Sequence, residues 1–121
     1  MMAQDFFSQW MWVELSTISE GYCKLKMPVK KEMLNGFGIL HGGVTFAFAD
    51  SAFAFASNSY GKVSVSLNAN MTYAKPAKKG DVLIAEAQKL AITSRTGTFD
   101  VKIYNQTSQE TIALFLSLIH I

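Results

Sequence analysis

Hydrophobic and polar residues alternate along most of this 121-residue chain, and the alternation predicts β-strands. Residues 12–29 (WVELSTISEGYCKLKMPV) show a loose period of two around Glu20-Gly21, which suits a hairpin turn. Four later segments alternate in the same way: KVSVSLNANMTYAKP from residue 62, DVLIAEAQKLAIT from residue 81, TFDVKIYNQ from residue 98 and ETIALFLSLIHI from residue 110. The turn sequences AKKGD and SRTG separate three of these predicted strands.

A different pattern runs from Val44 to Ser59, where apolar residues occur on every side of a helical wheel. This distribution predicts a helix that is buried all round. Residues 4–10 predict a short helix, and residues 30–40 predict a loop with turns at Asn35-Gly36 and Gly38. One buried helix among long strands indicates an α+β fold. Strands of about ten residues reach roughly 33 Å and a sixteen-residue helix only about 24 Å, so a curved sheet can wrap the helix.

Composition adds an expectation of assembly. At 121 residues the chain is expected to be one domain, residues 1–121, and 50% of its residues are hydrophobic while 17% are charged. So small a monomer cannot easily bury that much apolar surface, and one sheet wrapped on one helix leaves an edge free. Part of the surface is therefore expected to face a second copy.

Several function classes are not supported by the composition. The net charge of +2 is too small to indicate nucleic-acid binding, and a single cysteine excludes an internal disulfide and a cysteine-based metal cluster. The two histidines are too few and too far apart in the chain to indicate a metal site. Neither a secretory leader nor an apolar span is apparent, so we expect a cytoplasmic protein that does not enter a membrane.

Asp50 is the only charged residue between Asn35 and Ser59, and its neighbours are mostly alanine and phenylalanine. A lone aspartate of this kind is more often structural than functional, but it lies too far into the predicted helix to cap it. Desolvation among apolar neighbours is costly without a partner or a function, and it is expected to raise the pKa of the carboxyl group. Perturbed carboxylates in apolar surroundings are enriched at active sites.

The sequence His41-Gly42-Gly43 opens the predicted helix. The first N–H groups of a helix have no internal partner, and glycine lets a ligand approach the backbone closely. Such a helix start is able to stabilise a developing oxyanion without a serine nucleophile. A tight strand-to-helix turn that needs two glycines is the alternative explanation.

Gly42, Asp50 and the amide of Asn35 together form a hydrolytic set that needs neither a metal nor a serine. Eight helical residues place Gly42 and Asp50 roughly 12 Å apart along the axis, too far for both to act on one carbonyl within one chain. If both groups act on one substrate, Asp50 faces the Gly42 of a second subunit. The active sites are then shared across a symmetric dimer.

Residues 33–61 (MLNGFGILHGGVTFAFADSAFAFASNSYG) closely resemble the signature of hotdog-fold acyl-CoA thioesterases of the phenylacetate-degradation, or PaaI-like, type. Residues 69–87 (ANMTYAKPAKKGDVLIAEA) are similar to the next segment of that family. The resemblance implies a hotdog fold, in which a curved antiparallel sheet wraps one long central helix. It also implies dimers that pair into a continuous sheet, and homotetramers that form as dimers of dimers.

The resemblance also implies roles for individual residues. The acid at Asp50 would act as general base or nucleophile, the N–H of Gly42 would polarise the thioester carbonyl, and Asn35 would position water or substrate. A water-holding hydroxyl of some relatives is absent here, because Ala54 occupies its position, and Ser66 is the best substitute. The implied catalytic residues are thus Asp50, Gly42 and Asn35, and the implied substrate-binding residues are His41, Gly43 and Ser66.

The predicted activity is hydrolysis of an aryl-acetyl or medium-sized acyl-CoA to the free acid and coenzyme A. No cofactor is expected, because coenzyme A is part of the substrate. The lysines at 75, 78 and 79 and Arg95 are candidates to contact its phosphates. Two alternatives stay open: a 3-hydroxyacyl thioester dehydratase or hydratase that uses His41, and a non-catalytic acyl-CoA-binding module that would not need Asp50.

Overall fold

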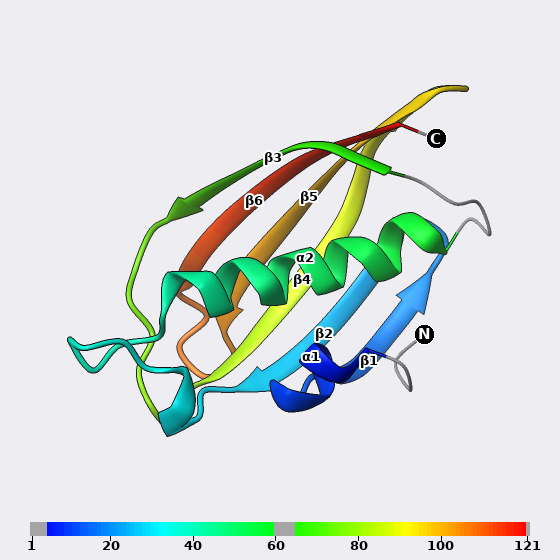
Figure 1. Ribbon diagram of the computed structural model, residues 1–121. Helices are drawn as coiled ribbons and strands as arrows, with labels where there is room; N and C mark the ends of the chain where they lie inside the picture. Colours follow the sequence, from blue (N-terminus) through cyan, green and yellow to red (C-terminus); the bar gives the residue numbers. More distant parts are fainter. Residues whose placement is uncertain (1–4, 60–64, 121) are drawn as a thin grey trace.

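The computed structural model describes residues 5–59 and 65–120, and within them all strands belong to one antiparallel sheet (Figure 1). Its six strands lie in the order β1-β2-β4-β5-β6-β3. The strand bounds are β1 Glu14–Ser19, β2 Tyr22–Pro28, β3 Val65–Tyr73, β4 Val82–Ile92, β5 Thr96–Asn105 and β6 Thr111–His120. The predicted hairpin is confirmed: Gly21 takes the left-handed conformation (φ 74°) between β1 and β2. The strand predicted from residue 62 is described from Val65 onward, and residues 62–64 lie outside the described part of the chain.

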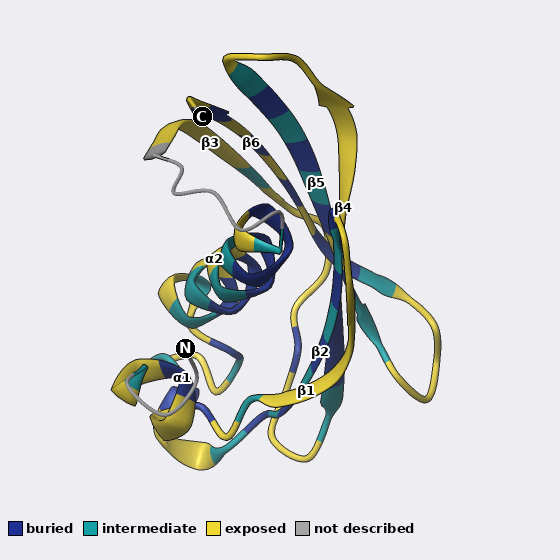
Figure 2. Ribbon diagram, turned by 90° about the vertical axis from the view of Figure 1, so that its right-hand side faces the viewer, coloured by how far each residue is buried: buried dark blue, intermediate teal, exposed yellow. Residues whose placement is uncertain are grey.

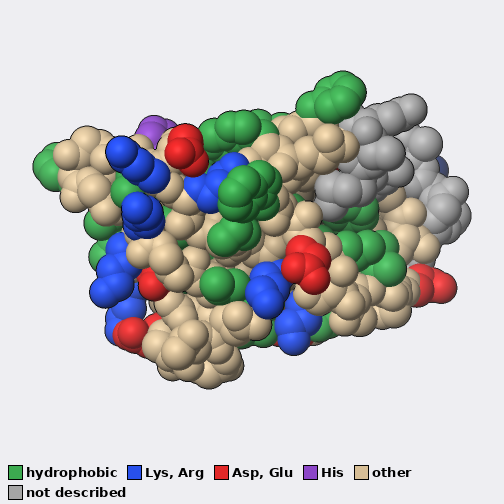
Figure 3. Space-filling view, turned by 90° about the horizontal axis from the view of Figure 1, so that it is seen from below, with side chains coloured by type: hydrophobic (Ala, Val, Ile, Leu, Met, Phe, Trp, Pro, Cys, Tyr) green, Lys and Arg blue, Asp and Glu red, His purple; other side chains and the backbone are tan. Residues whose placement is uncertain are grey.

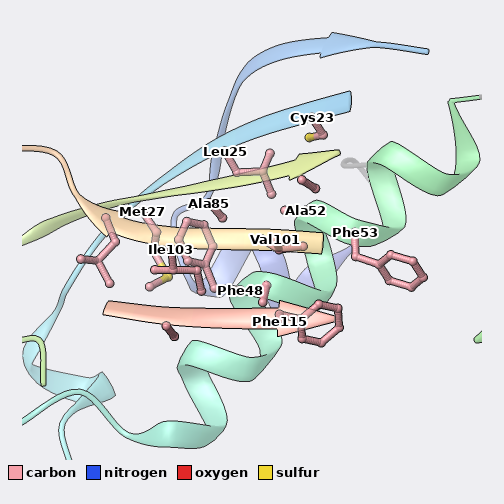
Figure 4. Close-up of a cluster of buried hydrophobic side chains, with 14 of the residues drawn as sticks. Cys23, Leu25, Met27, Phe48, Ala52, Phe53, Ala85, Val101, Ile103 and Phe115 are labelled. Atoms are coloured by element: carbon pink, nitrogen blue, oxygen red, sulfur yellow. The ribbon is translucent and has the colours of Figure 1, made fainter. Parts of the chain in front are cut away.

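The sheet curves around the long helix α2 (Gly42–Asn58), which lies on its concave side (Figures 1 and 2). Buried residues alternate along β2, β5 and β6, as expected for strands with one face on a core. The registers place Val101 beside both Ala87 and Phe115 on that face. These side chains and those of α2 form one core, part of which is shown in Figure 4. Within it Phe53 meets Phe99 edge-on, at 5.6 Å between ring centroids. The predicted α+β hotdog architecture is confirmed.

Helix α2 is buried on its sheet side only. Phe48 and Ala52 are fully buried, whereas Asp50 and Asn58 are exposed on the outer side. Phe46 lies at the margin, partly exposed but with its ring against Phe115 of β6. The prediction of a helix buried all round is therefore wrong for the single chain. Apolar residues on the outer side of α2 are available for a contact that one sheet cannot supply.

Strand β3 lies at one edge of the sheet and pairs only with β6. An open edge of this kind, predicted above, offers unpaired backbone groups to another strand. Figure 2 shows β3 above α2, on the side of the molecule that the sheet leaves open.

The short helix α1 (Phe6–Trp10) lies beside α2, on the flank away from β3 (Figure 2). The Asp5 carboxylate accepts hydrogen bonds from the N–H and the hydroxyl of Ser8, at 3.1 and 2.7 Å. Because that hydroxyl already donates to a carboxylate, the Ser51 hydroxyl 3.0 Å away must donate to it. Buried Ser8 and Met11 thus seat α1 on the core.

Candidate active site

The start of α2 has one backbone donor without a partner. The ring nitrogen Nδ1 of His41 accepts from the N–H of Gly43 at 2.8 Å. The carbonyl of His41 accepts from the N–H groups of Val44 and Thr45, at 3.0 and 3.2 Å. Among the described residues, the N–H of Gly42 has no acceptor. A helix start of this kind attracts negative charge, so Gly42 is the group in this turn that can bind an oxyanion.

Gly43 must be small because it lies against the capping histidine. A Cβ atom placed on Gly43 would lie 3.0 Å from Nδ1 of His41 and 3.1 Å from Cε1. The second glycine of the motif therefore makes room for the cap. Since Nδ1 of His41 accepts a hydrogen bond from the backbone, that atom is not free to act as a base.

Asn35 shapes the loop that precedes α2. Its side-chain oxygen accepts from the N–H of Phe37 at 2.9 Å and, more weakly, from that of Ile39 at 3.4 Å. Its backbone N–H donates to the carbonyl of Ile39 at 2.8 Å. The oxygen is thus used within the loop, and the side-chain NH₂ group is the part of Asn35 that can meet a ligand.

Asp50 lies in the middle of α2, on the exposed outer side. Its eight-residue separation from Gly42 corresponds to about 12 Å along the helix axis. Although the side chain is exposed in the single chain, partial burial raises the pKa of the Asp50 carboxyl above its usual value of 3.8. No cationic partner offsets this effect among the described residues.

Ser66 lies at the other end of the molecule from Gly42. It is the second residue of β3, while Tyr73 ends β3 and contacts Gly42, so about 23 Å of strand separates Ser66 from that contact. The Ser66 hydroxyl lies 3.3 Å from that of Ser117. Asn35, His41, Gly42 and Gly43 therefore gather at the start of the helix, whereas Asp50 and Ser66 of the same chain do not join them.

A hollow of about 380 Å³ opens beside the start of α2. Asn35 and Gly42 line it together with Thr45 and Tyr73, to which the sequence analysis gave no role. The hydroxyl of Tyr73 donates to the carbonyl of Gly42 at 3.0 Å. Only the alternation of β3, which turns Tyr73 toward the concave side opposite Ala113, could have suggested this contact.

Neither a metal site nor a membrane span is found in the part of the chain that the structure describes. Residues 5–59 and 65–120 contain no group of three or more His, Cys, Asp or Glu side chains placed to hold a metal ion. No helix within these residues is long and apolar enough to cross a bilayer.

Comparison with known proteins identifies the family. Residues 37–112 match the family model described as the thioesterase superfamily. The chain belongs to this superfamily. The predicted family is thereby confirmed, and the free N–H of Gly42 and the carboxylate of Asp50 both lie on a helix inside the matched region.

Relatives within the thioesterase superfamily align with most of the chain. The acyl-coenzyme A thioesterase PaaI of Escherichia coli is 36% identical over 120 residues, which are 99% of this chain and 85% of that protein. A putative esterase of Archaeoglobus fulgidus is 41% identical over 92 residues, which are 76% of this chain and 60% of that protein. The match therefore covers less than two thirds of the archaeal protein's length.

Solved structures of this superfamily share the fold. The E. coli PaaI protein from the phenylacetic acid degradation operon superposes with a TM-score of 0.95 at 35% identity, covering 98% of this chain and 86% of that chain. The smu.793 protein of Streptococcus mutans, solved with acetyl-CoA bound, superposes with a TM-score of 0.85 at 25% identity, covering 89% of this chain and 86% of that chain.

Proposed function

We propose that this chain is an acyl-CoA thioesterase that hydrolyses aryl-acetyl or medium-sized acyl-CoA to the free acid and coenzyme A. The observation that carries the proposal is the unpartnered N–H of Gly42 at a helix start, together with a carboxylate of raised pKa on the same helix. The name of the E. coli relative and the acetyl-CoA bound to the S. mutans protein support this substrate class.

The catalytic pair requires two chains. Gly42 and Asp50 of one chain are about 12 Å apart along α2, but Asp50 is exposed on the outer side of the helix, and β3 is a free edge of the sheet. In a dimer whose β3 edges pair, the two α2 helices lie side by side across the two-fold axis. Asp50 of each chain then faces the start of the partner's helix, and two equivalent active sites form.

In the proposed reaction, Asp50 accepts a proton from a water molecule as the water oxygen bonds to the thioester carbonyl carbon. The N–H of Gly42 stabilises the negative charge that develops on the carbonyl oxygen. The C–S bond then breaks, and the coenzyme A sulfur takes the proton from Asp50, which leaves the carboxylic acid and a free thiol. Alternatively, Asp50 attacks directly and water cleaves the mixed anhydride. Label found in the Asp50 carboxylate after turnover in heavy-oxygen water identifies this second route.

Coenzyme A is proposed to lie in a groove that leads away from Gly42. The hollow at the helix start shares Lys75, Pro76 and Ala77 with a second hollow of about 580 Å³, which is also lined by Lys78. Lysine side chains lie toward this end of the molecule, and others lie near the middle of the face shown in Figure 3. Ammonium groups along the groove suit the phosphates of coenzyme A, although Lys75 is paired with Glu110 in the free chain.

Lys78→Ala tests the groove. The variant is expected to raise KM for acyl-CoA while leaving kcat nearly unchanged. The reason is that the Lys78 contact to coenzyme A would stabilise the bound substrate and the transition state equally. Arg95→Ala is the matched control, since Arg95 lies in the turn between β4 and β5 and does not line the groove. Equal KM values for the two variants would contradict the proposed coenzyme A path.

The outer face of the sheet is the proposed contact between dimers. Leu114, Leu116 and Leu118 alternate outward along β6 and are 49%, 43% and 38% exposed. Such a row of leucines favours burial against a second dimer, giving a homotetramer.

A cytoplasmic location and a reaction without any cofactor also belong to this proposal. Cell fractionation tests the location, and an unchanged rate after treatment with a chelator supports the absence of a metal.

Thiol release from a panel of aryl-acetyl and straight-chain acyl-CoAs tests the function. Asp50→Asn is expected to lower kcat by about two to four orders of magnitude. Gly42→Pro removes the proposed donor, and proline suits this position because it is the first of the helix and His41 before it is already extended (φ −63°, ψ 132°). This variant is expected to lose a factor of about 100 to 1,000 in kcat.

Gly42→Ala is the size control for Gly42→Pro, because it keeps the N–H and its Cβ would meet the Tyr73 ring at an ordinary 3.4 Å. It should lose clearly less activity than Gly42→Pro. Failure of the wild-type protein to release thiol from any thioester, or full activity of Asp50→Asn, would contradict the proposed function. Hydration or dehydration of acyl-CoA without thiol release would instead indicate the dehydratase chemistry.

A further inference from the structure

Tyr73, the last residue of β3, contacts the residue that is proposed to bind the oxyanion. Its hydroxyl donates to the carbonyl oxygen of Gly42 at 3.0 Å. Its ring atoms Cε1 and Cζ lie 3.4 Å from the point where a Cβ on Gly42 would sit. Tyr73 therefore contacts Gly42 in two ways, through a hydrogen bond to the carbonyl and through ring packing over the Cα atom.

The contact from Tyr73 adds to the few interactions that hold Gly42 in place. Glycine has no side chain to restrict its backbone, and the first residue of a helix is held by fewer hydrogen bonds than the interior. The His41 carbonyl, which belongs to the same peptide group as the N–H of Gly42, accepts from Val44 and Thr45. The Gly42 carbonyl belongs to the next peptide group, whose N–H at Gly43 donates to Nδ1 of His41. Within the described residues, Tyr73 supplies the side-chain hydrogen bond to Gly42.

We propose that Tyr73 is a positioning residue for thioester hydrolysis: its hydroxyl and ring hold Gly42 so that the N–H points at the thioester oxygen. This inference rests on the proposed function, since it assigns Gly42 the role of oxyanion donor. An oriented donor stabilises a transition state far better than a mobile one, because its alignment is set before the charge develops.

The position of Tyr73 also connects the donor to assembly. β3 is the free edge strand, and Tyr73 is 56% exposed in the single chain. In the proposed dimer a second β3 strand pairs with this edge, which immobilises the strand that carries Tyr73. Because Tyr73 is hydrogen-bonded to Gly42, a fixed β3 strand also restrains the start of α2. The N–H of Gly42 is therefore fully aligned only in the assembled protein.

Tyr73→Phe tests the proposal because it removes the hydroxyl and keeps the ring. We expect kcat for acyl-CoA hydrolysis to fall about tenfold, with KM changed less than twofold and with the dimer intact. The pH dependence of kcat/KM should keep the wild-type midpoint, since the variant acts on the donor and not on Asp50. Tyr22→Phe is the matched control: it also removes a bonded tyrosine hydroxyl, which donates to Glu86 away from the site, and kcat should stay at the wild-type value.

A second readout follows the donor directly. An acyl-CoA with an isotopically labelled carbonyl is bound to the inactive Asp50→Asn protein, and its infrared carbonyl stretch is recorded. The Gly42 N–H should move the band to lower frequency, and adding Tyr73→Phe should reduce and broaden that shift. A merely structural role of Tyr73 would leave the band unchanged in a folded, dimeric variant.

The outcomes separate this proposal from the proposed function. Suppose that Asp50→Asn abolishes hydrolysis, but Tyr73→Phe has the wild-type kcat or does not change the infrared carbonyl band. The positioning role of Tyr73 is then overturned, and the proposed thioesterase function is supported. If the wild-type protein releases no thiol, or Asp50→Asn is fully active, both proposals are overturned. A selective loss of kcat in Tyr73→Phe together with the smaller infrared shift supports both.

Discussion

Asp50 is an acid whose surroundings oppose its charge. Its apolar neighbours raise the pKa of its carboxyl, so the free protein holds a proton there up to a higher pH than an unperturbed aspartate would. A base with a raised pKa takes up a proton more readily, which suits the chemistry proposed for this residue. The same burial opposes folding once the carboxyl is ionised.

The stability of Asp50→Asn measures how much the ionised Asp50 carboxyl group opposes folding. Because the pKa of Asp50 is higher in the folded chain than the usual 3.8, the native state binds more protons than the unfolded chain between those two values. Stability that depends on Asp50 therefore falls as pH rises through this window. At neutral pH, Asp50→Asn is expected to melt at the same temperature as the wild type or higher, and below about pH 3.8 the two proteins should melt alike. Calorimetric scans across pH measure both differences.

Glu110→Gln is a control for that prediction, because the pKa of Glu110 is shifted in the opposite direction. Lys75 lowers the pKa of the Glu110 carboxyl, so the ionised form of Glu110 favours the folded state. Replacing it should lower the melting temperature slightly at neutral pH or leave it unchanged, since exposed ion pairs contribute little. A clear loss of stability in Asp50→Asn at neutral pH would contradict the assignment of Asp50 as a partly buried carboxyl group whose ionisation opposes folding.

Gly43 is predicted to tolerate no side chain. The Cβ of Gly43→Ala would come within 3.0 Å of Nδ1 of His41, so the imidazole must leave its place as the helix cap. Loss of such a cap is expected to lower the free energy of unfolding by about 1 kcal/mol, measured by urea denaturation. The less crowded Gly42→Ala is the comparison, and equal stability of the two variants would contradict a capping role for His41.

Much of the site at residue scale was predictable, because His41-Gly42-Gly43 and Asp50 stand out in a stretch that is otherwise apolar. The hydrogen-bond partners of the individual donor and acceptor atoms in the site were not predictable. The sequence does not reveal that the His41 ring uses the N–H of Gly43 and so leaves that of Gly42 free. Nor does it show that Asn35 turns its oxygen into its own loop, or that Tyr73 reaches Gly42 from a strand thirty-one residues later.

At the scale of elements, periodicity predicted the type and order of nearly every strand, since each has one face on the core. It failed on the side of α2 that faces away from the sheet. Apolar residues on every side of a helical wheel indicate that the helix is buried, but they do not identify the segment or subunit that covers each side. In this structure the sheet covers only one side of α2. Phe46 marks the margin of that cover, since its ring meets Phe115 of β6 at 5.4 Å between centroids and yet stays 36% exposed.

The turn after α1 contains a strained residue. Trp12 has a left-handed backbone (φ 57°), its ring is 65% exposed, and the ammonium of Lys30 lies 4.4 Å from the ring centroid. Trp12→Gly relieves the backbone strain and Trp12→Ala retains it, while both lose the ring. The glycine variant is therefore expected to be more stable than the alanine variant by about 1 kcal/mol. Thermal or urea unfolding checks the order, and an alanine variant as stable as the glycine variant would contradict it.

In the proposed function the molecule is half of a larger unit. The free edge of β3, the exposed side of α2 and the distance between Gly42 and Asp50 are the observations that support this proposal. The sequence alone suggested this arrangement from helical geometry, because eight residues of helix cannot bring those groups together. The sharing of the active site between chains is the central claim of this account.

Subunit mixing tests that claim most directly. Asp50→Asn and Gly42→Pro are each expected to be nearly inactive alone, but a mixed dimer of the proposed kind would contain one site with both functional groups and one with neither. When the two variants are co-expressed in equal amounts, half of the dimers are mixed, and about a quarter of the wild-type thioesterase activity should return. Activity no higher than that of the separate variants, in dimers shown to be mixed, would place Gly42 and Asp50 of each site in one chain and contradict the account.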